Sequence, residues 1–159
     1  MNVTILSRKA AETLLESAAF PKNAAVISFY SPEKARTGDY DPVDYKGKAR
    51  KLFYACVPDI DIEALPGFGY TYDSYFPDVD DLSEFIMNAV EQGMDIICQC
   101  DYGQSRSAAR ASAILERFER NGISIFADYR YYPNQLVFNK VYDALKRAPT
   151  TNERNAETE

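Results

Sequence analysis

The chain has 159 residues and contains no histidine. Without an imidazole it cannot form a Ser-His-Asp triad, a Cys-His pair or a histidine metal site, so its chemistry must use carboxylates, thiols, hydroxyls, cations or backbone groups. The 18 basic and 24 acidic residues give a net charge of −6. A net negative charge repels polyanions at long range and argues against a nucleic-acid partner.

The size and composition indicate one ordinary globular domain. A chain of this length can bury a core without staples, and 46% hydrophobic with 26% charged residues is a typical balance. The three cysteines, Cys56, Cys98 and Cys100, are too few for a secreted disulfide framework. No apolar run approaches the roughly 18 residues of a membrane span, and the N-terminus carries no secretory signal. We therefore expect a cytoplasmic protein with no membrane partner.

Apolar periodicity predicts seven elements along the chain. In order, they are a helix over 8–19, capped by Ser7; strands over 24–30 and 50–57; a helix from about 80 to Gly93; a strand over 94–99; a helix over 105–120; and a helix from about Pro133 onward. Strands separated by helices predict an α/β fold with a mostly parallel central sheet flanked by helices. We expect one domain over residues 1–147 and a flexible polar tail over 148–159, where the periodicity ends.

The stretch CDYGQSRS, residues 100–107, lies between a predicted strand and a predicted helix, where parallel sheets bind ligands. The five residues between Cys100 and Arg106 can wrap their amide N–H groups around an oxyanion, Gly103 permits a positive φ, and the helix adds its positive end. At this chain's own residue frequencies, Cys, Gly, Ser, Arg and Ser occur at these spacings by chance roughly 3 times in 100,000. We therefore expect an anion-binding loop whose substrate-binding residues are Asp101, Tyr102, Gly103, Gln104 and Ser105.

Three side chains of this loop are suited to act on phosphate. The donors that hold an oxyanion also stabilise a thiolate, so Cys100 should have a depressed pKa and act as the nucleophile. Arg106 can bind two phosphate oxygens in a bidentate fork and stabilise the transition state. Ser107 can donate a hydrogen bond to the sulfur. The alternative for Cys100 is a buried structural thiol, which is the usual state of an unpaired cysteine.

The loop resembles that of the cysteine-dependent phosphatases of the tyrosine and dual-specificity type, whose signature is HCxxGxSRS. Here the stretch reads QCDYGQSRSAA, with Gln99 where the family has histidine. The chain also looks like a small bacterial and phage group of dual-specificity-like phosphatases, in which a "DDID" turn and a YRPN-like segment are matched by Val57-Pro58-Asp59-Ile60-Asp61 and Tyr131-Tyr132-Pro133-Asn134. The resemblance implies a three-layer tyrosine-phosphatase-like domain. It also implies a metal-independent reaction, without a cofactor, that passes through a cysteinyl phosphate.

The leaving group of such a reaction needs a proton, which in this chain must come from a carboxyl group. Asp59 is the first candidate for the catalytic acid, because it follows Val57-Pro58 at a strand end, where the family places its mobile general acid. Asp61 is the second candidate. The alternative for Asp59 is that it only starts a turn after Pro58.

Other interpretations of the site remain open at the level of sequence. An acidic Asp101 would repel phosphate unless it points outward or pairs with a cation, and Gln99 replaces the histidine only in part, since it can still donate an amide N–H. The chain can therefore be a catalytically impaired phosphate-binding module, or less plausibly a rhodanese-like sulfur transferase. The expected partner is a phosphorylated protein or a small phosphate monoester, and an RNA 5′-phosphatase is disfavoured by the net charge. The sequence predicts no oligomeric state.

Two further features have alternative roles. The aromatic residues of the long loop after the second predicted strand either form a lid over a phosphotyrosine ring or pack the loop onto the domain. These residues are Phe68, Tyr70, Tyr72, Tyr75 and Phe76, with Tyr40 and Tyr45 of the preceding loop as weaker candidates. Cys98, or Cys56, either forms a protective disulfide with Cys100 or, as we expect for Cys98, packs in the core.

Overall fold

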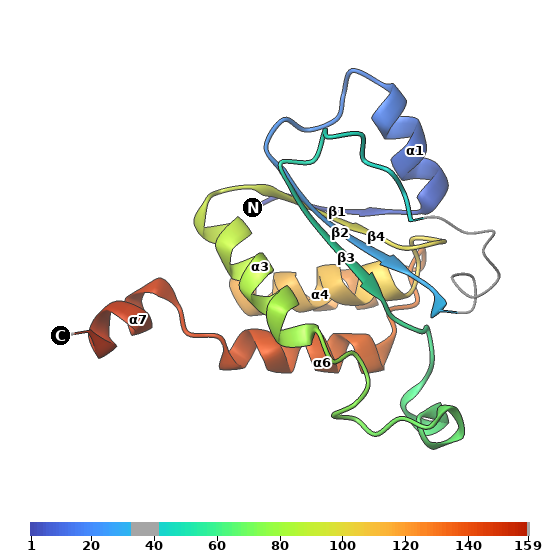
Figure 1. Ribbon diagram of the computed structural model, residues 1–159, viewed down its shortest axis with the longest axis vertical. Helices are drawn as coiled ribbons and strands as arrows, with labels where there is room; N and C mark the ends of the chain where they lie inside the picture. The colour runs from blue at the N-terminus through green and yellow to red at the C-terminus, as the bar shows by residue number, and fades with distance from the viewer. Residues whose placement is uncertain (33–41, 159) are drawn as a thin grey trace.

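A four-stranded parallel sheet forms the centre of the molecule, in the order β1-β4-β2-β3 (Figure 1). The structure is a computed structural model and describes residues 1–32 and 42–158, so Tyr40 lies outside the described residues. The strands are β1 (Val3–Leu6), β2 (Ala24–Tyr30), β3 (Lys51–Cys56) and β4 (Asp95–Gln99). The predicted α/β fold with a mostly parallel sheet is confirmed.

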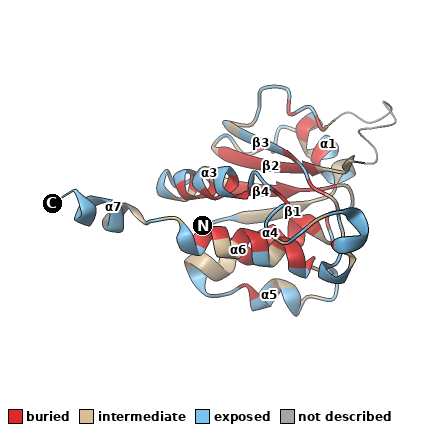
Figure 2. Ribbon diagram, turned by 60° about the horizontal axis from the view of Figure 1, so that its bottom comes forward, coloured by how far each residue is buried: buried red, intermediate tan, exposed pale blue. Residues whose placement is uncertain are grey.

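Both faces of β2 are buried, as expected for a central strand of a parallel sheet (Figure 2). Side chains alternate along the strand, so Ile27 and Phe29 join one hydrophobic cluster while Ala24 and Val26 join another on the opposite face. Because both faces are buried, the strand is a nearly continuous apolar run, AAVISFY. Such a run can be recognised from the sequence, and its predicted bounds are confirmed.

Helices cover the two faces of the sheet unequally. Helix α1 (Arg8–Glu16), capped by Ser7, lies on one face, where Ala11 and Leu15 pack with β2. The other face carries α3 (Val79–Glu91), α4 (Arg106–Glu119) and α6 (Gln135–Arg147), whose apolar sides form the larger cluster (Figure 1). The resulting layers are helix, sheet and helices. Among the described residues, no helix combines the length and apolar character needed to cross a membrane.

The structure contains elements that periodicity does not predict. Strand β1 has only four half-buried residues, and it is ordered by its pairing with β4, from Val3 opposite Ile96 onward. Two short 3-10 turns (Ile62–Ala64 and Pro66–Phe68) interrupt the loop after β3, and α5 (Ile123–Phe126) is a single helical turn. All are too short to show a periodic pattern.

The polar segment after α6 contains a helix, α7 (Thr151–Glu157), where we expected no regular structure. Thr150 and Glu153 form a capping box at its start, and the side chain of Arg154 reaches Glu91 of α3 at 3.4 Å. A capping box stabilises a helix without any buried face, which explains why the apolar pattern gave no signal. The expected flexible tail is therefore helical in this structure, while the domain boundary at residue 147 stays a prediction.

Candidate active site

The anion-binding loop lies at the carboxyl end of β4, with Cys100 directly after the strand and Arg106 as the first residue of α4. The loop is fixed on one side by the β1–α1 turn, where Cys100 N donates to Leu6 O at 3.3 Å and Arg8 N donates to Asp101 O at 3.1 Å. On the other side, Tyr132 N donates to the carbonyl oxygen of residue 104 at 2.8 Å. The loop geometry is therefore set by segments far apart in the sequence.

Gly103 meets two requirements of this loop. Its φ of +69° lies in the left-handed region, as the sequence predicts for this position. A Cβ atom at this residue would also lie 2.6 Å from Ser7 N and 2.9 Å from Leu6 C. Any larger residue would push the loop away from the β1–α1 turn.

The thiol of Cys100 lies at the bottom of the loop and is 2% exposed. Its Sγ is 3.1 Å from Ser107 Oγ, which can donate to the thiolate. Burial raises the pKa of Cys100, but the positive charge of Arg110, the hydroxyl and amide of Ser107 and the charge of Arg106 outweigh it, so that the pKa is lowered from its ordinary value. The loop thus favours the nucleophilic form, in the direction that the sequence predicts.

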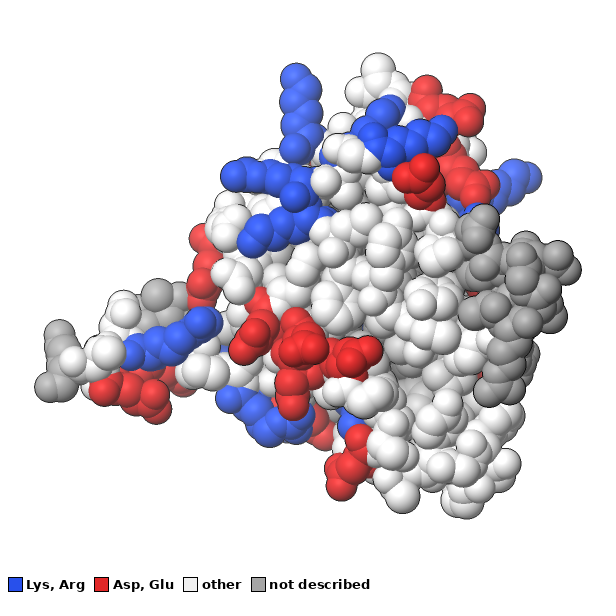
Figure 3. All heavy atoms as spheres, in the orientation of Figure 1, with Lys and Arg blue, Asp and Glu red and all other residues white. Residues whose placement is uncertain are grey.

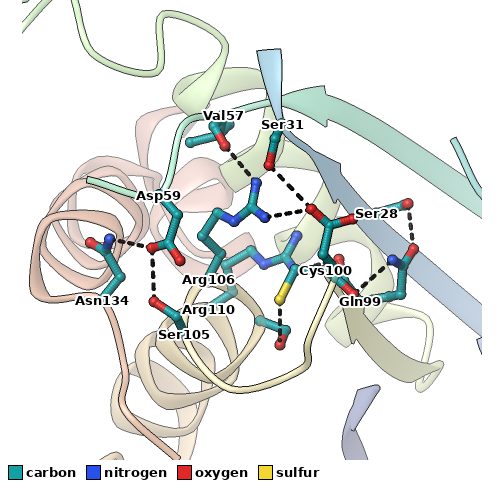
Figure 4. A network of polar contacts seen from close by, with 12 residues as sticks. Ser28, Ser31, Val57, Asp59, Gln99, Cys100, Ser105, Arg106, Arg110 and Asn134 are labelled. Carbon is teal, nitrogen blue, oxygen red and sulfur yellow. Dashed lines mark hydrogen bonds and ion pairs between the residues drawn. The ribbon is translucent and has the colours of Figure 1, made fainter. Parts of the chain in front are cut away.

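The guanidinium of Arg106 is 3% exposed and borders a cavity that also contains Cys100 (Figure 4). Its Nη1 donates to Val57 O at 2.8 Å, and its Nη2 lies 3.2 Å from Asp101 Oδ2. In the part of the chain that the structure describes, Nε is buried and has no hydrogen-bond partner.

Asp101 does not present an unpaired carboxylate to a bound anion. Its side chain is 6% exposed and pairs with Arg106, and Ser31 Oγ donates to the same Oδ2 atom at 3.2 Å. From the sequence, an acidic Asp101 was expected either to point outward or to pair with a cation. The structure shows that it pairs with Arg106. The backbone of Asp101 still belongs to the loop that would surround the anion.

Asp59 lies beside the loop, held by two hydrogen bonds to one oxygen (Figure 4). Ser105 Oγ donates to Asp59 Oδ1 at 2.8 Å, and Asn134 Nδ2 donates to the same atom at 2.7 Å. Within the described residues Oδ2 has no hydrogen bond, so it can carry a proton toward the cavity that Asp59 borders. Asp61 borders the same cavity but makes no side-chain capping bond to the 3-10 turn that it precedes. Both carboxylates therefore border the cavity, and the assignment of Asp59 as the acid stays a prediction.

Solved structures match this chain over nearly its whole length. They include human tyrosine phosphatase-like serine/threonine/tyrosine-interacting protein, with a TM-score of 0.59 and 14% identity over 92% of this chain and 94% of that one. Human DUSP28 matches with a TM-score of 0.55 and 14% identity over 91% and 88%. PTPMT1 in complex with PI(5)P matches with a TM-score of 0.53 and 12% identity over 99% and 95%. A scan against protein-family models and a search of curated proteins find no match.

The chain has the fold of the tyrosine and dual-specificity phosphatases. The predicted three-layer phosphatase-like domain is thereby confirmed, whereas the bacterial or phage type stays a prediction. At 12–14% identity the matches establish the fold alone, so any reaction must be argued from this chain's own residues.

Gln99 occupies the position of the motif histidine of this phosphatase fold and is completely buried. Its Oε1 accepts hydrogen bonds from Ser28 Oγ at 2.6 Å and Tyr45 Oη at 2.9 Å, and its Nε2 donates to Cys100 O at 3.0 Å. Gln99 is therefore a neutral residue with hydrogen bonds at both side-chain polar atoms, and it holds the backbone of the nucleophile. Tyr45 is 1% exposed and bonded below the loop, so it is not a substrate-stacking residue.

The cavity in front of Cys100 measures about 790 Å³, and its aromatic lining differs from the expected lid. The aromatic residues that border it are Tyr102, Phe126, Tyr131 and Tyr132. None of the five expected lid residues borders it, and the buried Tyr75 and Phe76 pack the loop onto the core, with Phe29 and Phe76 5.2 Å apart. The packing alternative holds for the buried Tyr75 and Phe76 and for the partly buried Tyr70 and Tyr72, whereas Phe68 is 56% exposed and neither borders the cavity nor packs in the core. Tyr131 and Tyr132 stand in the YYPN segment, which the sequence singled out without assigning these side chains a role.

Cys98 is completely buried in the hydrophobic core, and burial raises its pKa to about 11. This confirms the expectation that Cys98 packs in the core, on the same side of β4 as Cys100. The reasoning from sequence missed two residues. Asn134 joins Asp59 to α6, where it also caps the helix through Val137 N at 2.9 Å. Arg110, one turn after Arg106, received no role in the sequence analysis and is fully buried despite its charge.

Proposed function

We propose that this chain is a phosphatase that hydrolyses aryl phosphate monoesters, phosphotyrosine in a protein foremost, through a cysteinyl-phosphate intermediate. The observation that carries the proposal is the pairing of two groups in one cavity. Cys100 has a lowered pKa, and the buried Arg106 guanidinium belongs to the lining of the same cavity. One attacks phosphorus and the other stabilises the charge that develops on the phosphate oxygens.

In the first step, the thiolate of Cys100 attacks phosphorus. The Sγ–P bond forms as the bond from phosphorus to the ester oxygen breaks, and the electron pair of that bond leaves with the oxygen. The carboxyl group of Asp59 donates its proton to this oxygen, so that the product leaves as a neutral alcohol or phenol. Loop amides and Arg106 hold the phosphoryl oxygens throughout.

In the second step, water hydrolyses the intermediate. The carboxylate of Asp59, deprotonated by the first step, takes a proton from water as the oxygen attacks phosphorus. The S–P bond breaks and its electrons return to Cys100 as a thiolate, which Ser107 stabilises from 3.1 Å. The cycle ends with inorganic phosphate and a reprotonated Asp59.

The lining of the cavity favours an aromatic ester over a polyanionic head group. Arg106 is the only lysine or arginine among the described residues that border it, whereas Asp59, Asp61 and Glu63 contribute carboxylates. PTPMT1 was determined with the phosphoinositide PI(5)P, a ligand with more than one phosphate. In this chain a second phosphate would meet carboxylates, while Tyr102 and Tyr132, 77% and 74% exposed, can stack on an aryl ring.

The surface gives no support to a long RNA as substrate. On the described part of the face shown in Figure 3, basic side chains gather at the upper left and acidic side chains near the centre, and no continuous basic track crosses this face. Tight binding of a nucleic-acid backbone depends on several lysine or arginine contacts to phosphates. The net charge of −6 adds a long-range repulsion.

The test is hydrolysis of para-nitrophenyl phosphate and a phosphotyrosine peptide by the wild type with a chelator present, beside PI(5)P in vesicles. We expect turnover of both aryl esters, little turnover of PI(5)P, and complete loss in Cys100→Ser. Cys56→Ser is the matched control, since Cys56 does not border the cavity, and it should retain activity. Turnover that persists in Cys100→Ser would refute the mechanism. Tungstate binding by a wild type that turns over neither ester would instead identify a phosphate-binding module.

A further inference from the structure

Arg110 is a second arginine beneath the loop, one helical turn after Arg106, and its side chain is 0% exposed. Its Nη2 donates to Gln99 O at 2.8 Å and its Nη1 to Ile27 O at 3.3 Å. The guanidinium carbon lies 3.6 Å from the centroid of the Phe29 ring. Arg110 does not border the cavity, so a substrate does not reach it.

The charge of Arg110 has no carboxylate partner in the region that the structure describes. The ionisable groups that act on it are Cys98, Cys100, Tyr45 and Arg106. Burial lowers the pKa of Arg110 to about 10, which leaves it cationic at neutral pH. A buried cation needs a compensating charge, and two carbonyl oxygens and an aromatic face supply only partial charges.

Among the described groups that act on Arg110, Cys100 is the one that can supply a full negative charge. Burial raises the pKa of both Cys98 and Tyr45, so these two groups stay neutral, and Arg106 is itself a cation. The pKa of Cys100 is lowered, and the charge of Arg110 contributes more to that lowering than the charge of Arg106 does. A thiolate and a buried guanidinium therefore stabilise each other's charged form.

The ionisable and polar groups around the thiol come from several elements. They are Arg106, Ser107 and Arg110 of α4, Cys98 of β4, Asp101 of the loop, Asp59 of the segment after β3, and Tyr45 of the loop before β3. The two carboxylates are held elsewhere, since Asp101 pairs with Arg106 and Asp59 accepts from Ser105 and Asn134. Neither carboxylate neutralises Arg110.

Alternation along β4 explains why the compensating cation belongs to α4. Residue 99 points to the face that carries α1, where its side chain contacts Ser28 and Tyr45, whereas Cys100 belongs to the cluster on the α4 face. The neutral side chain of Gln99 therefore lies on the opposite side of the strand from the sulfur. Figure 4 shows the Arg110 side chain beside Cys100, on the same side as Arg106.

We propose that Arg110 is the buried counter-ion of the Cys100 thiolate, a positioning residue that keeps the nucleophile ionised in a chain without the motif histidine. It acts through Cys100 and does not touch substrate. Its importance for turnover rests on the proposed function. The ionisation of the thiol does not, because it can be measured in the absence of any substrate.

The experiment measures the rate of Cys100 alkylation by iodoacetamide as a function of pH, read by mass spectrometry in a Cys56→Ser background. Arg110→Met removes the charge and keeps the apolar stem, and Arg110→Lys keeps a charge. Arg106→Met is the matched control, because it removes the other arginine of the site in the same way. Only the thiolate reacts, so the rate rises with pH through the pKa of Cys100. We expect the midpoint to move upward by about 1 to 2 pH units in Arg110→Met, by less in Arg106→Met, and to return toward wild type in Arg110→Lys.

Two outcomes would overturn the proposal. An unchanged midpoint in folded Arg110→Met, with only a lower thermal stability, would make Arg110 a packing residue. If Arg110→Met does not fold, Arg106→Met decides: a midpoint that stays below that of an ordinary thiol, about 8.5, supports Arg110, and one that returns to that value assigns the effect to Arg106. If the chain shows no phosphatase activity but the midpoint of alkylation still depends on Arg110, the counter-ion role is retained. Only the proposed function is then refuted.

Discussion

Arg106 and Arg110 stand one turn apart on the same helix, both are at least 97% buried, and both have an Nε atom without a hydrogen-bond partner among the described residues. Their surroundings differ. Arg106 borders the cavity and pairs with Asp101, whereas Arg110 contacts two strand carbonyls and the face of Phe29. Helix α4 thus directs one cation at the phosphate site and the next at the underside of the loop.

The two arginines, Arg106 and Arg110, therefore have different electrostatic roles. The ion pair with Asp101 fixes the direction of the Arg106 guanidinium, leaving it suited to hold an anion that arrives and departs. Arg110 lies where no substrate charge arrives, so its partner must be a permanent part of the protein. A change at position 106 should therefore affect the binding of oxyanions, and one at position 110 the ionisation of the thiol.

The largest effect is expected for Arg106→Ala. Loss of the donors that stabilise the transition state should lower kcat/KM for para-nitrophenyl phosphate by about 10³-fold, or about 4 kcal/mol. Tungstate affinity, measured by calorimetry, should fall as well. Arg110→Met should leave tungstate affinity within a few-fold of wild type when measured well below the pKa of the thiol. An equal loss of tungstate binding in both variants would break the distinction between the two arginines.

A smaller effect is expected for Gly103→Ala, which tests whether the loop beneath Arg106 depends on its contact with the β1–α1 turn. The left-handed φ costs about 1 to 2 kcal/mol, and the approach of the new Cβ to Ser7 adds a similar overpacking cost, so the free energy of unfolding should fall by about 3 kcal/mol. Gly47→Ala is the control, since its φ is +70° but a Cβ there would meet nothing within 4 Å. Chemical denaturation of both variants checks the difference, and equal losses would show that the close approach adds nothing.

The loop itself could be predicted because its chemistry is local. Cys100, Gly103 and Arg106 are specified by spacing within one turn between a strand and a helix, and the structure places Cys100 and Arg106 at one cavity, with Gly103 in the loop between them. The strands β2 and β4 could be predicted for the same reason, since a short apolar run between polar segments is readable without the rest of the chain.

The surroundings of the loop could not be predicted, because they depend on contacts distant in sequence. The pattern around α4 shows a charged residue at Arg110 but not the strand carbonyls and the ring of Phe29 that enclose it. The cavity lining likewise comes from residues 126–136, which fold back beside residues 59–63. The aromatic loop that composition suggested as a possible lid instead buries the rings of Tyr75 and Phe76 in the core.

For Asp59→Asn we expect kcat/KM to fall by about 10²-fold, or about 2.7 kcal/mol, with an ordinary phosphotyrosine substrate. A carboxyl that gives its proton to the leaving group produces a basic limb in the pH profile, and the variant should lose that limb. The acidic limb, which reports the thiol next to Arg110, should stay in place. Asp61→Asn is the matched control and should keep the basic limb. Loss of the limb in Asp61→Asn instead would transfer the role of acid to Asp61.

Ser107→Ala should have the smallest effect of the series. It tests how much of the stabilisation of the Cys100 thiolate comes from Arg110 and how much from a neutral hydrogen-bond donor. Loss of the hydroxyl 3.1 Å from Cys100 Sγ should raise the pKa of the thiol by less than Arg110→Met does and lower kcat/KM by about tenfold. Ser112→Ala removes a buried hydroxyl of the same helix, bonded to Gly122 O at 2.8 Å, and should leave the pH profile unchanged. Alkylation profiles of both serine variants and Arg110→Met give the order directly. A larger upward displacement in Ser107→Ala than in Arg110→Met would make the hydroxyl, rather than the buried cation, the principal stabiliser of the thiolate.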